Sequence, residues 1–197
     1  MTAQIVREIS ASAFTDAIEM LAIIEVLVAG NEKPVIKGVN DAGAGRAAEH
    51  VKRALFTRLH LLVARCYGKT RRKDRHARKA FEILKDPNVA KEMQSPTDLK
   101  GAQTKWDACC SDDRLTAFIH FRDKYIAHLG EPDPGLGIPT YGEVFALTRA
   151  TATALEKLAH ATGVVMLTLE SQVPTHRESA QKFFAPWRGA QVVKPER

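Results

Sequence analysis

Apolar side chains recur at three- and four-residue steps along almost the whole of this 197-residue chain. This spacing places them on one face of an α-helix, whereas no pair of segments alternates as paired β-strands would. Short connections between such helices are typical of a bundle. The sequence therefore predicts an all-α helical bundle with short extra helices. The first long helix is expected to end near residue 30. The other long helices are expected at about 47–67, 98–110, 112–130 and 141–169.

Glycine, proline and capping residues set the expected helix ends. Residues 31–45 contain Pro34 and three glycines, so this segment is predicted to be a loop. Asp98 and Ser111 are expected to cap the helices that follow them, because a side-chain oxygen can accept from free backbone N–H groups. Residues 164–169 are rich in β-formers, but the helical period continues through them, which favours helix.

Chain length and charge distribution define the organisation of the molecule. A chain of this length with 45% apolar residues fits one domain, expected at residues 1–185 and followed by a loose tail at 186–197. The net charge of +6 is concentrated in one segment with a single acid, and the rest of the chain is neutral. We call its seven cations the basic strip: Lys69, Arg71, Arg72, Lys73, Arg75, Arg78 and Lys79.

Several classes of protein are not indicated. The N-terminus lacks the pattern of a signal peptide, and no apolar stretch reaches the ~20 residues that span a bilayer. Three cysteines make a disulfide framework improbable and are typical of a reducing compartment. No Cys/His group has zinc-ligand spacing. We therefore expect a cytoplasmic protein without membrane contact, metal or cofactor.

The segment 114–130 carries the residues best suited to chemistry. On a helix, Arg122 falls in the middle of an apolar stripe that includes Tyr125. A guanidinium in such a position needs a carboxylate, backbone carbonyls or an anionic ligand such as phosphate. His128 lies in the last predicted turn, where the helix dipole favours a protonated imidazole and hence a proton donor.

The residues FRDKYIAH, Phe121 to His128, resemble the R-x(4–6)-H signature of the HEPN superfamily (higher eukaryotes and prokaryotes nucleotide-binding). The R-D-K-x-x-A-H form and the order of the predicted helices are most similar to the abortive-infection, AbiU-type branch. The resemblance implies a helical bundle that forms a homodimer through the motif helix. In active members it also implies cleavage of RNA without a metal ion.

The resemblance assigns roles to three residues. Arg122 would orient or neutralise the scissile phosphate, and His128 would act as general acid or base at the ribose 2′-OH or the leaving oxygen. Asp123 occupies the polar position that is often part of such sites. We therefore expect an endoribonuclease with a toxin–antitoxin or phage-defence role. Its expected partners are RNA and an antitoxin protein.

Less specific interpretations compete with each assignment. Arg122 can instead form a structural ion pair with Glu19, Glu25 or Glu49, in a non-catalytic module that binds nucleotide, RNA or a protein partner. Tyr125 is expected to pack in the core. The basic strip is either a solvated loop and helix start or a surface that holds RNA; in the second case it should line the approach to the dimer cleft. A DNA-binding regulator is a third, weaker possibility.

Overall fold

The computed structural model describes residues 2–70, 74–127, 131, 133 and 135–189. Within these ranges the chain forms helices and no strand, which confirms the predicted all-α class. None of the helices described is long and apolar enough to span a lipid bilayer. The helices are α1 (Thr2–Gly30), α2 (Lys33–Asp41), α3 (Gly45–Cys66), α4 (Ala77–Ile83), α5 (Pro87–Lys91), α6 (Pro96–Cys110), α7 (Asp113–Phe121), η1 (Arg122–Ala127), α8 (Tyr141–Thr162), α9 (Leu169–Phe184) and η2 (Ala185–Arg188).

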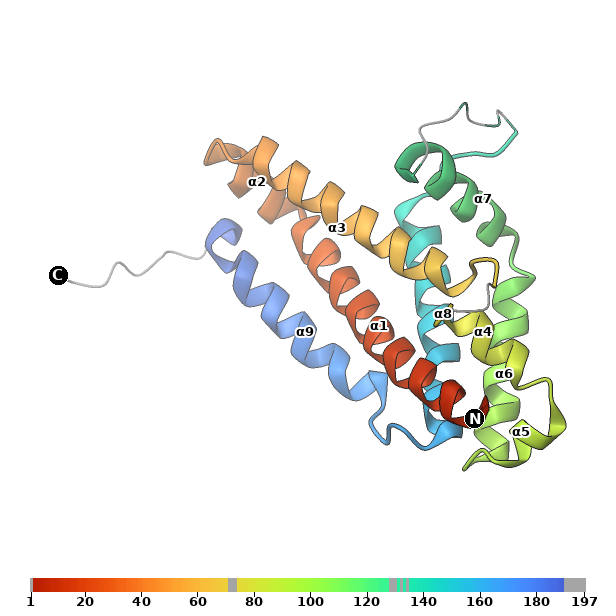
Figure 1. The fold of residues 1–197 in the computed structure, drawn as a ribbon. Coiled ribbons are helices and arrows are strands. Elements are labelled where there is room, and N and C mark those ends of the chain that lie inside the picture. Colours follow the sequence, from red (N-terminus) through yellow and green to blue (C-terminus); the bar gives the residue numbers. More distant parts are fainter. Residues whose placement is uncertain (1, 71–73, 128–130, 132, 134, 190–197) are drawn as a thin grey trace.

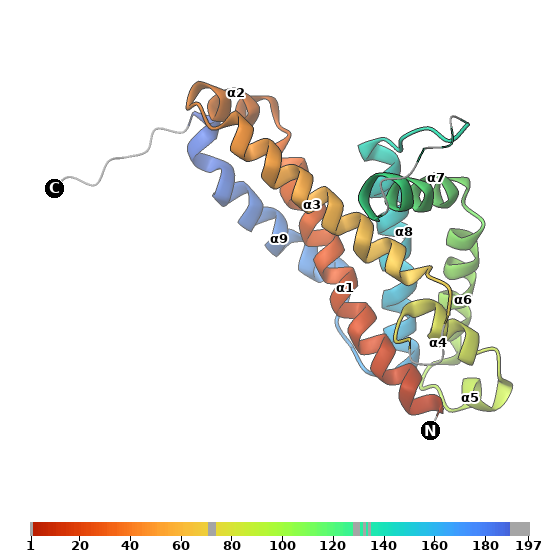
Figure 2. The same ribbon diagram turned by 45° about the horizontal axis from the view of Figure 1, so that its top comes forward.

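Helix α1 is the centre of the bundle. Figure 1 shows it running between α3 and α9, with α8 crossing behind it. Side chains all along α1, such as Val6, Met20 and Leu27, are fully buried. Helix α8 packs against α1 on one side and against α6 on the other. In both views α4 lies toward the N-terminal end of α1, whereas α7 lies near the start of α8 (Figure 2).

The prediction of a loop over residues 31–45 is wrong for its central part, which forms α2. Pro34 stands in the first turn of α2, where a missing N–H costs nothing. Val35 and Val39 are buried, so tertiary packing outweighs the weak helix propensity of this segment. A Cβ atom at Gly38 would lie 2.1 Å from the backbone oxygen of Trp187, so this glycine lets η2 approach α2 closely.

The chain reverses direction at Gly163, where the sequence predicted a continuous helix. Gly163 has a left-handed backbone, with φ of 72°, and ends α8. Residues 164–168 are neither helix nor strand, and Thr168 then caps α9. The predicted helix over 164–169 is therefore wrong except at Leu169, which begins α9.

Two caps and the C-terminal segment also differ from the prediction. Ser95, rather than Asp98, caps α6, and its hydroxyl accepts from the Asp98 backbone N–H at 3.2 Å. Asp112, rather than Ser111, caps α7. Residues 186–188, assigned by the sequence to the loose tail, belong to η2. Residues 190–197 lie outside the described residues.

His60 joins α3 to α7 within the core. Its ring stacks on Phe118 of α7, with centroids 4.3 Å apart, and meets Phe56 edge-on at 4.4 Å. The Nδ1 atom lies 2.9 Å from the Phe56 carbonyl oxygen, which accepts its proton. Burial lowers the pKa of His60 to about 4, although the hydrogen bond to Phe56 opposes the shift. The imidazole is therefore neutral in the folded protein at neutral pH.

The neutral state of His60 predicts acid sensitivity. Below pH 6.5 the unfolded chain takes up a proton at this position and the folded chain does not, so stability falls until about pH 4. The slope from this group approaches about 1.4 kcal/mol per pH unit. His60→Phe removes the titrating group and should flatten this part of the pH profile. Urea unfolding followed by circular dichroism between pH 4 and 7.5 measures both proteins; parallel profiles would exclude His60 as the source.

Gly163→Ala should destabilise the bundle through two effects that a second variant separates. A left-handed alanine costs about 1–2 kcal/mol, and the new Cβ would also lie 1.6 Å from Oε1 of Gln94. Gly43 has a similar φ of 71° but no atom within 4 Å of its Cβ position, so Gly43→Ala carries only the backbone cost. Thermal unfolding should show a larger loss for Gly163→Ala, and equal losses would contradict the close packing of Gln94.

Candidate functional site

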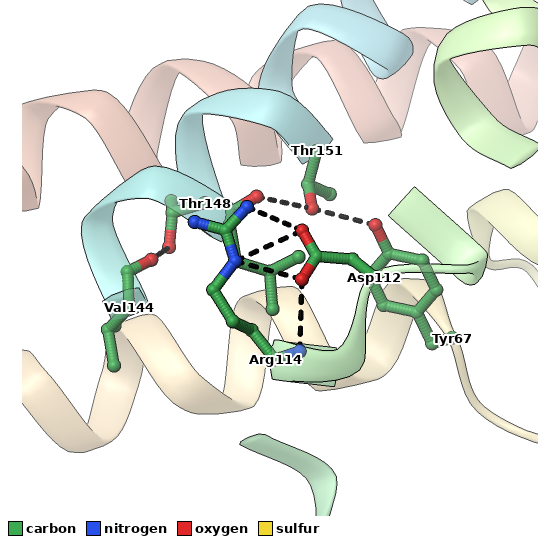
Figure 3. Close-up of polar contacts among 7 residues, drawn as sticks. Tyr67, Asp112, Arg114, Val144, Thr148 and Thr151 are labelled. Carbon is green, nitrogen blue, oxygen red and sulfur yellow. Dashed lines mark hydrogen bonds and ion pairs between the residues drawn. The ribbon is translucent and has the colours of Figure 1, made fainter. Parts of the chain in front are cut away.

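Helix α7 begins beside a partly buried group of polar side chains, shown in Figure 3. The Asp112 carboxylate accepts from the Arg114 backbone N–H at 2.9 Å and from the Arg114 Nε at 2.8 Å. The hydrogen bond with the Arg114 side chain is the main cause that lowers the pKa of Asp112. In the same view, the hydroxyls of Tyr67 and Thr151 lie 2.7 Å apart and join the end of α3 to α8. The Asp112 contacts therefore cap the first turn of α7, and the Tyr67–Thr151 contact ties α3 to α8.

From Arg122 onward the motif forms a π-helix, whereas the sequence predicted a continuous α-helix. Segment η1, Arg122–Ala127, follows α7 directly. Its i→i+5 pattern places Ala127 one turn after Arg122. Single π-helical turns are rare in proteins, and those that do occur are often found at functional sites. His128 is the next residue of the motif and lies outside the described residues, as do Leu129 and Gly130.

Arg122 is half-buried at the edge of the bundle. Its side chain is 28% exposed, and its Nε atom lies 2.6 Å from Oδ1 of Asp123. This ion pair lacks hydrogen-bond geometry, so the buried Nε–H has no hydrogen-bond acceptor in the described part of the chain. The structure therefore places two of the three predicted catalytic residues, Arg122 and Asp123, in direct contact.

The three carboxylates considered as structural partners of Arg122 pair with other cations. The pairs are Glu19 with Arg58 at 2.8 Å, Glu25 with Arg177 at 2.9 Å, and Glu49 with Lys52 at 4.0 Å. The alternative in which one of these three carboxylates neutralises Arg122 is therefore not observed. Because Asp123 is its neighbour in sequence, the contact between them does not fasten η1 to another helix.

The sequence predicted that Tyr125 packs in the core, but the structure places it at the surface. It is 38% exposed, and its ring stacks on Phe121 with centroids 5.0 Å apart. Phe121 in turn contacts Phe56 of α3, with centroids at 6.4 Å. The apolar stripe of the motif is therefore buried at Phe118, in α7, and reaches the surface at Tyr125, in η1.

The basic strip lies beyond the far end of α3 from the motif. Phe56 contacts the motif, whereas α3 ends ten residues later at Cys66, about 15 Å along the helix axis. Arg75 forms an ion pair with Glu8 at 2.6 Å, and Arg78 forms one with Glu82 at 3.5 Å.

Among the described strip residues, the two lysines, Lys69 and Lys79, have no ion pair with a described residue. Arg71, Arg72 and Lys73 lie outside the described residues. Internal pairing therefore reduces the charge that the described part of the strip offers to a ligand.

Helix α3 carries a second group of basic side chains that the sequence analysis missed. Arg46, His50 and Arg53 are exposed, and their spacing places them on one side of the helix. Helix α3 contains five Lys or Arg residues and only one acid, Glu49. The overall charge sum concealed this excess, because acids elsewhere in the chain cancel it. A charge count for each predicted helix would have found it.

The described residues contain no group of three or more His, Cys, Asp or Glu side chains that is arranged to hold a metal ion.

Comparison with known proteins identifies the family of the chain. The HEPN_AbiU2 family model, described as AbiU2, matches residues 3–183, which is most of the sequence. No curated protein and no solved structure matches the chain. The match includes the whole of α7 and η1 and extends from the second residue of α1 into the last turn of α9. The chain therefore belongs to the AbiU2 family of HEPN domains.

Proposed function

We propose that this protein is a dimeric endoribonuclease that cleaves RNA without a metal ion and acts in abortive infection or as a toxin. The observation that carries the proposal is the state of Arg122. Its guanidinium is half-buried and contacts a carboxylate from its own turn, whereas Glu19, Glu25 and Glu49, the alternative structural partners, pair with other cations. Such an arginine is suited to an anionic ligand, because its planar N–H groups match two phosphate oxygens.

The proposed reaction is transfer of the scissile phosphate to the neighbouring 2′-OH. The 2′ oxygen attacks phosphorus, the bond to the 5′ oxygen breaks, and a cyclic phosphate and a 5′-hydroxyl result. One proton leaves the 2′-OH and one reaches the 5′ oxygen. Arg122 neutralises the charge that develops on the phosphate, Asp123 orients Arg122, and His128 transfers a proton as general acid or base.

A homodimer completes the proposed site. Contact between two motif helices would bring both Arg122–His128 pairs to one cleft. An abortive-infection role is supported by membership of the AbiU2 family. An antitoxin protein is the expected regulatory partner, since an unrestrained ribonuclease would damage its own cell.

The catalytic assignment predicts that Arg122→Ala and His128→Ala each slow cleavage by about 100-fold or more. The assay is purified protein with total RNA in EDTA, read on a denaturing gel. Arg7→Ala is the control, because Arg7 lies near the start of α1 and bonds the Glu92 carbonyl oxygen at 3.0 Å.

Circular dichroism and sizing chromatography are run on the same variants. Folded, dimeric but inactive variants would support the ribonuclease. Unfolded or monomeric Arg122→Ala would instead support a non-catalytic module in which the arginine is structural. A wild-type protein that cleaves nothing would refute the proposal.

Because the basic strip begins about 15 Å along α3 from the motif, it is proposed to hold RNA that extends beyond the cleft. Its two lysines without described ion pairs provide a test. Replacing both Lys69 and Lys79 by alanine should weaken RNA binding at all sequences. It should also lower the salt dependence of binding by about two phosphate contacts. Lys100→Ala with Lys157→Ala, on α6 and α8, is the matched control of equal charge change. Equal salt slopes for both double variants would exclude the strip from the RNA path.

A further inference from the structure

We propose that a row of aromatic rings beside Arg122 is a base-stacking surface that holds an unpaired nucleotide next to the scissile phosphate. This inference rests on the proposed function and names how the substrate is positioned. The row consists of Tyr125, Phe121, Phe56, Tyr141 and Phe145, and we call it the aromatic row.

The aromatic row is continuous across three helical segments that lie far apart in the sequence. Centroid distances between successive rings are 5.0 Å for Tyr125–Phe121, 6.4 Å for Phe121–Phe56, 4.5 Å for Phe56–Tyr141 and 5.8 Å for Tyr141–Phe145. The rings come from the motif helix, from α3 and from α8. One end of the row is three residues from Arg122, within the same π-helix.

Two members of the row are exposed to solvent. Tyr125 is 38% exposed and Tyr141 is 44% exposed, whereas the three phenylalanines are half-buried. The phenylalanines therefore hold the tyrosines in place, so little side-chain entropy is lost when a base stacks on them. Stacking on rigid aromatic rings is how many proteins bind unpaired bases, because every base has a π-face.

Three arginines lie near members of the aromatic row and are suited to the phosphates of a bound strand. Arg122 precedes Tyr125 by three residues, Arg53 precedes Phe56 by three on α3, and the Arg149 guanidinium carbon lies 5.9 Å from the Phe145 ring centroid. Arg53 is exposed and forms no ion pair with a described residue.

One acid of α3, Glu49, carries a charge opposite to these cations. Burial, and to a smaller extent the negative charge of Glu49, raise the pKa of Tyr141. The Tyr141 hydroxyl therefore stays uncharged and does not repel phosphate.

This charge pattern favours RNA over a second copy of the chain as the occupant. If another copy covered the α3 and α8 part of the aromatic row symmetrically, Arg53 and Arg149 of one copy would face those of the other, with no ion pair to a described residue that offsets their charge. Like charges in such an arrangement oppose association. The row also leads away from the motif helix, through which the dimer is proposed to form, onto α3 and α8.

The test uses a fluorescent 2′-O-methyl oligoribonucleotide, which cannot be cleaved, as a single strand and annealed to its complement. Fluorescence anisotropy should show that Tyr125→Ala and Tyr141→Ala each weaken single-strand binding on the order of 10- to 100-fold. Tyr141→Phe should bind like the wild type, because it keeps the ring. Phe183→Ala is the matched control, since Phe183 is 63% exposed on α9, outside the row. The duplex should bind weakly to every variant.

Three results would overturn the inference: unchanged single-strand binding by both tyrosine-to-alanine variants, equal loss with Phe183→Ala, or duplex binding as tight as single-strand binding. Conversion of a dimer to a monomer by Tyr141→Ala on sizing chromatography would also overturn it, and would assign the row to the subunit interface.

The binding probe reports on the stacking surface without any cleavage of RNA. Tyrosine-dependent binding without cleavage of total RNA would thus reject the ribonuclease and leave the stacking surface, whereas cleavage with tyrosine-independent binding would reject only the stacking surface.

Discussion

The burial of α1 is the constraint on which the rest of the bundle depends. A 29-residue helix with apolar side chains on several faces needs cover on each of them, and α3, α8 and α9 provide it. The described part of the motif segment contributes little to this cover. Helix α7 and segment η1 contact α3 and α8 instead, so they lie at the edge of the bundle (Figure 2). A polar residue such as Arg122 can occupy that edge without a charge partner in the core.

Periodicity was enough to predict the helical class, because a buried helix face depends on residue spacing alone. It failed where packing between distant segments decides the outcome. Helix α2 forms despite Pro34 because Val35 and Val39 are buried against other helices. The break at Gly163 was missed because α8 and α9 both pack on α1, so the apolar pattern continues after the chain has reversed. Neither effect is visible in a local window of sequence.

The candidate site likewise has some features that are visible in the sequence and others that only the fold reveals. Arg122 and Asp123 were singled out from the sequence because they belong to a short motif, and their catalytic roles stay a prediction. The π-helix was not, because its hydrogen-bond pattern differs from an α-helix by one residue and leaves no distinct apolar period. The aromatic row was also missed, since Phe56 and Tyr141 are 85 positions apart and meet only in the fold. A short motif is therefore visible in the sequence, whereas contacts between distant segments become visible only in the fold.

The π-helical turn has a consequence for how the motif can vary. Such a turn is an α-helical turn that has accepted one additional residue, so it absorbs an insertion without disturbing the helix before it. In this chain the turn lies between the arginine and the histidine of the signature. Gain or loss of one residue there would change the count between them while Asp112 still fixes the start of α7. The tolerance of R-x(4–6)-H for different spacings is then a property expected of the backbone at this turn.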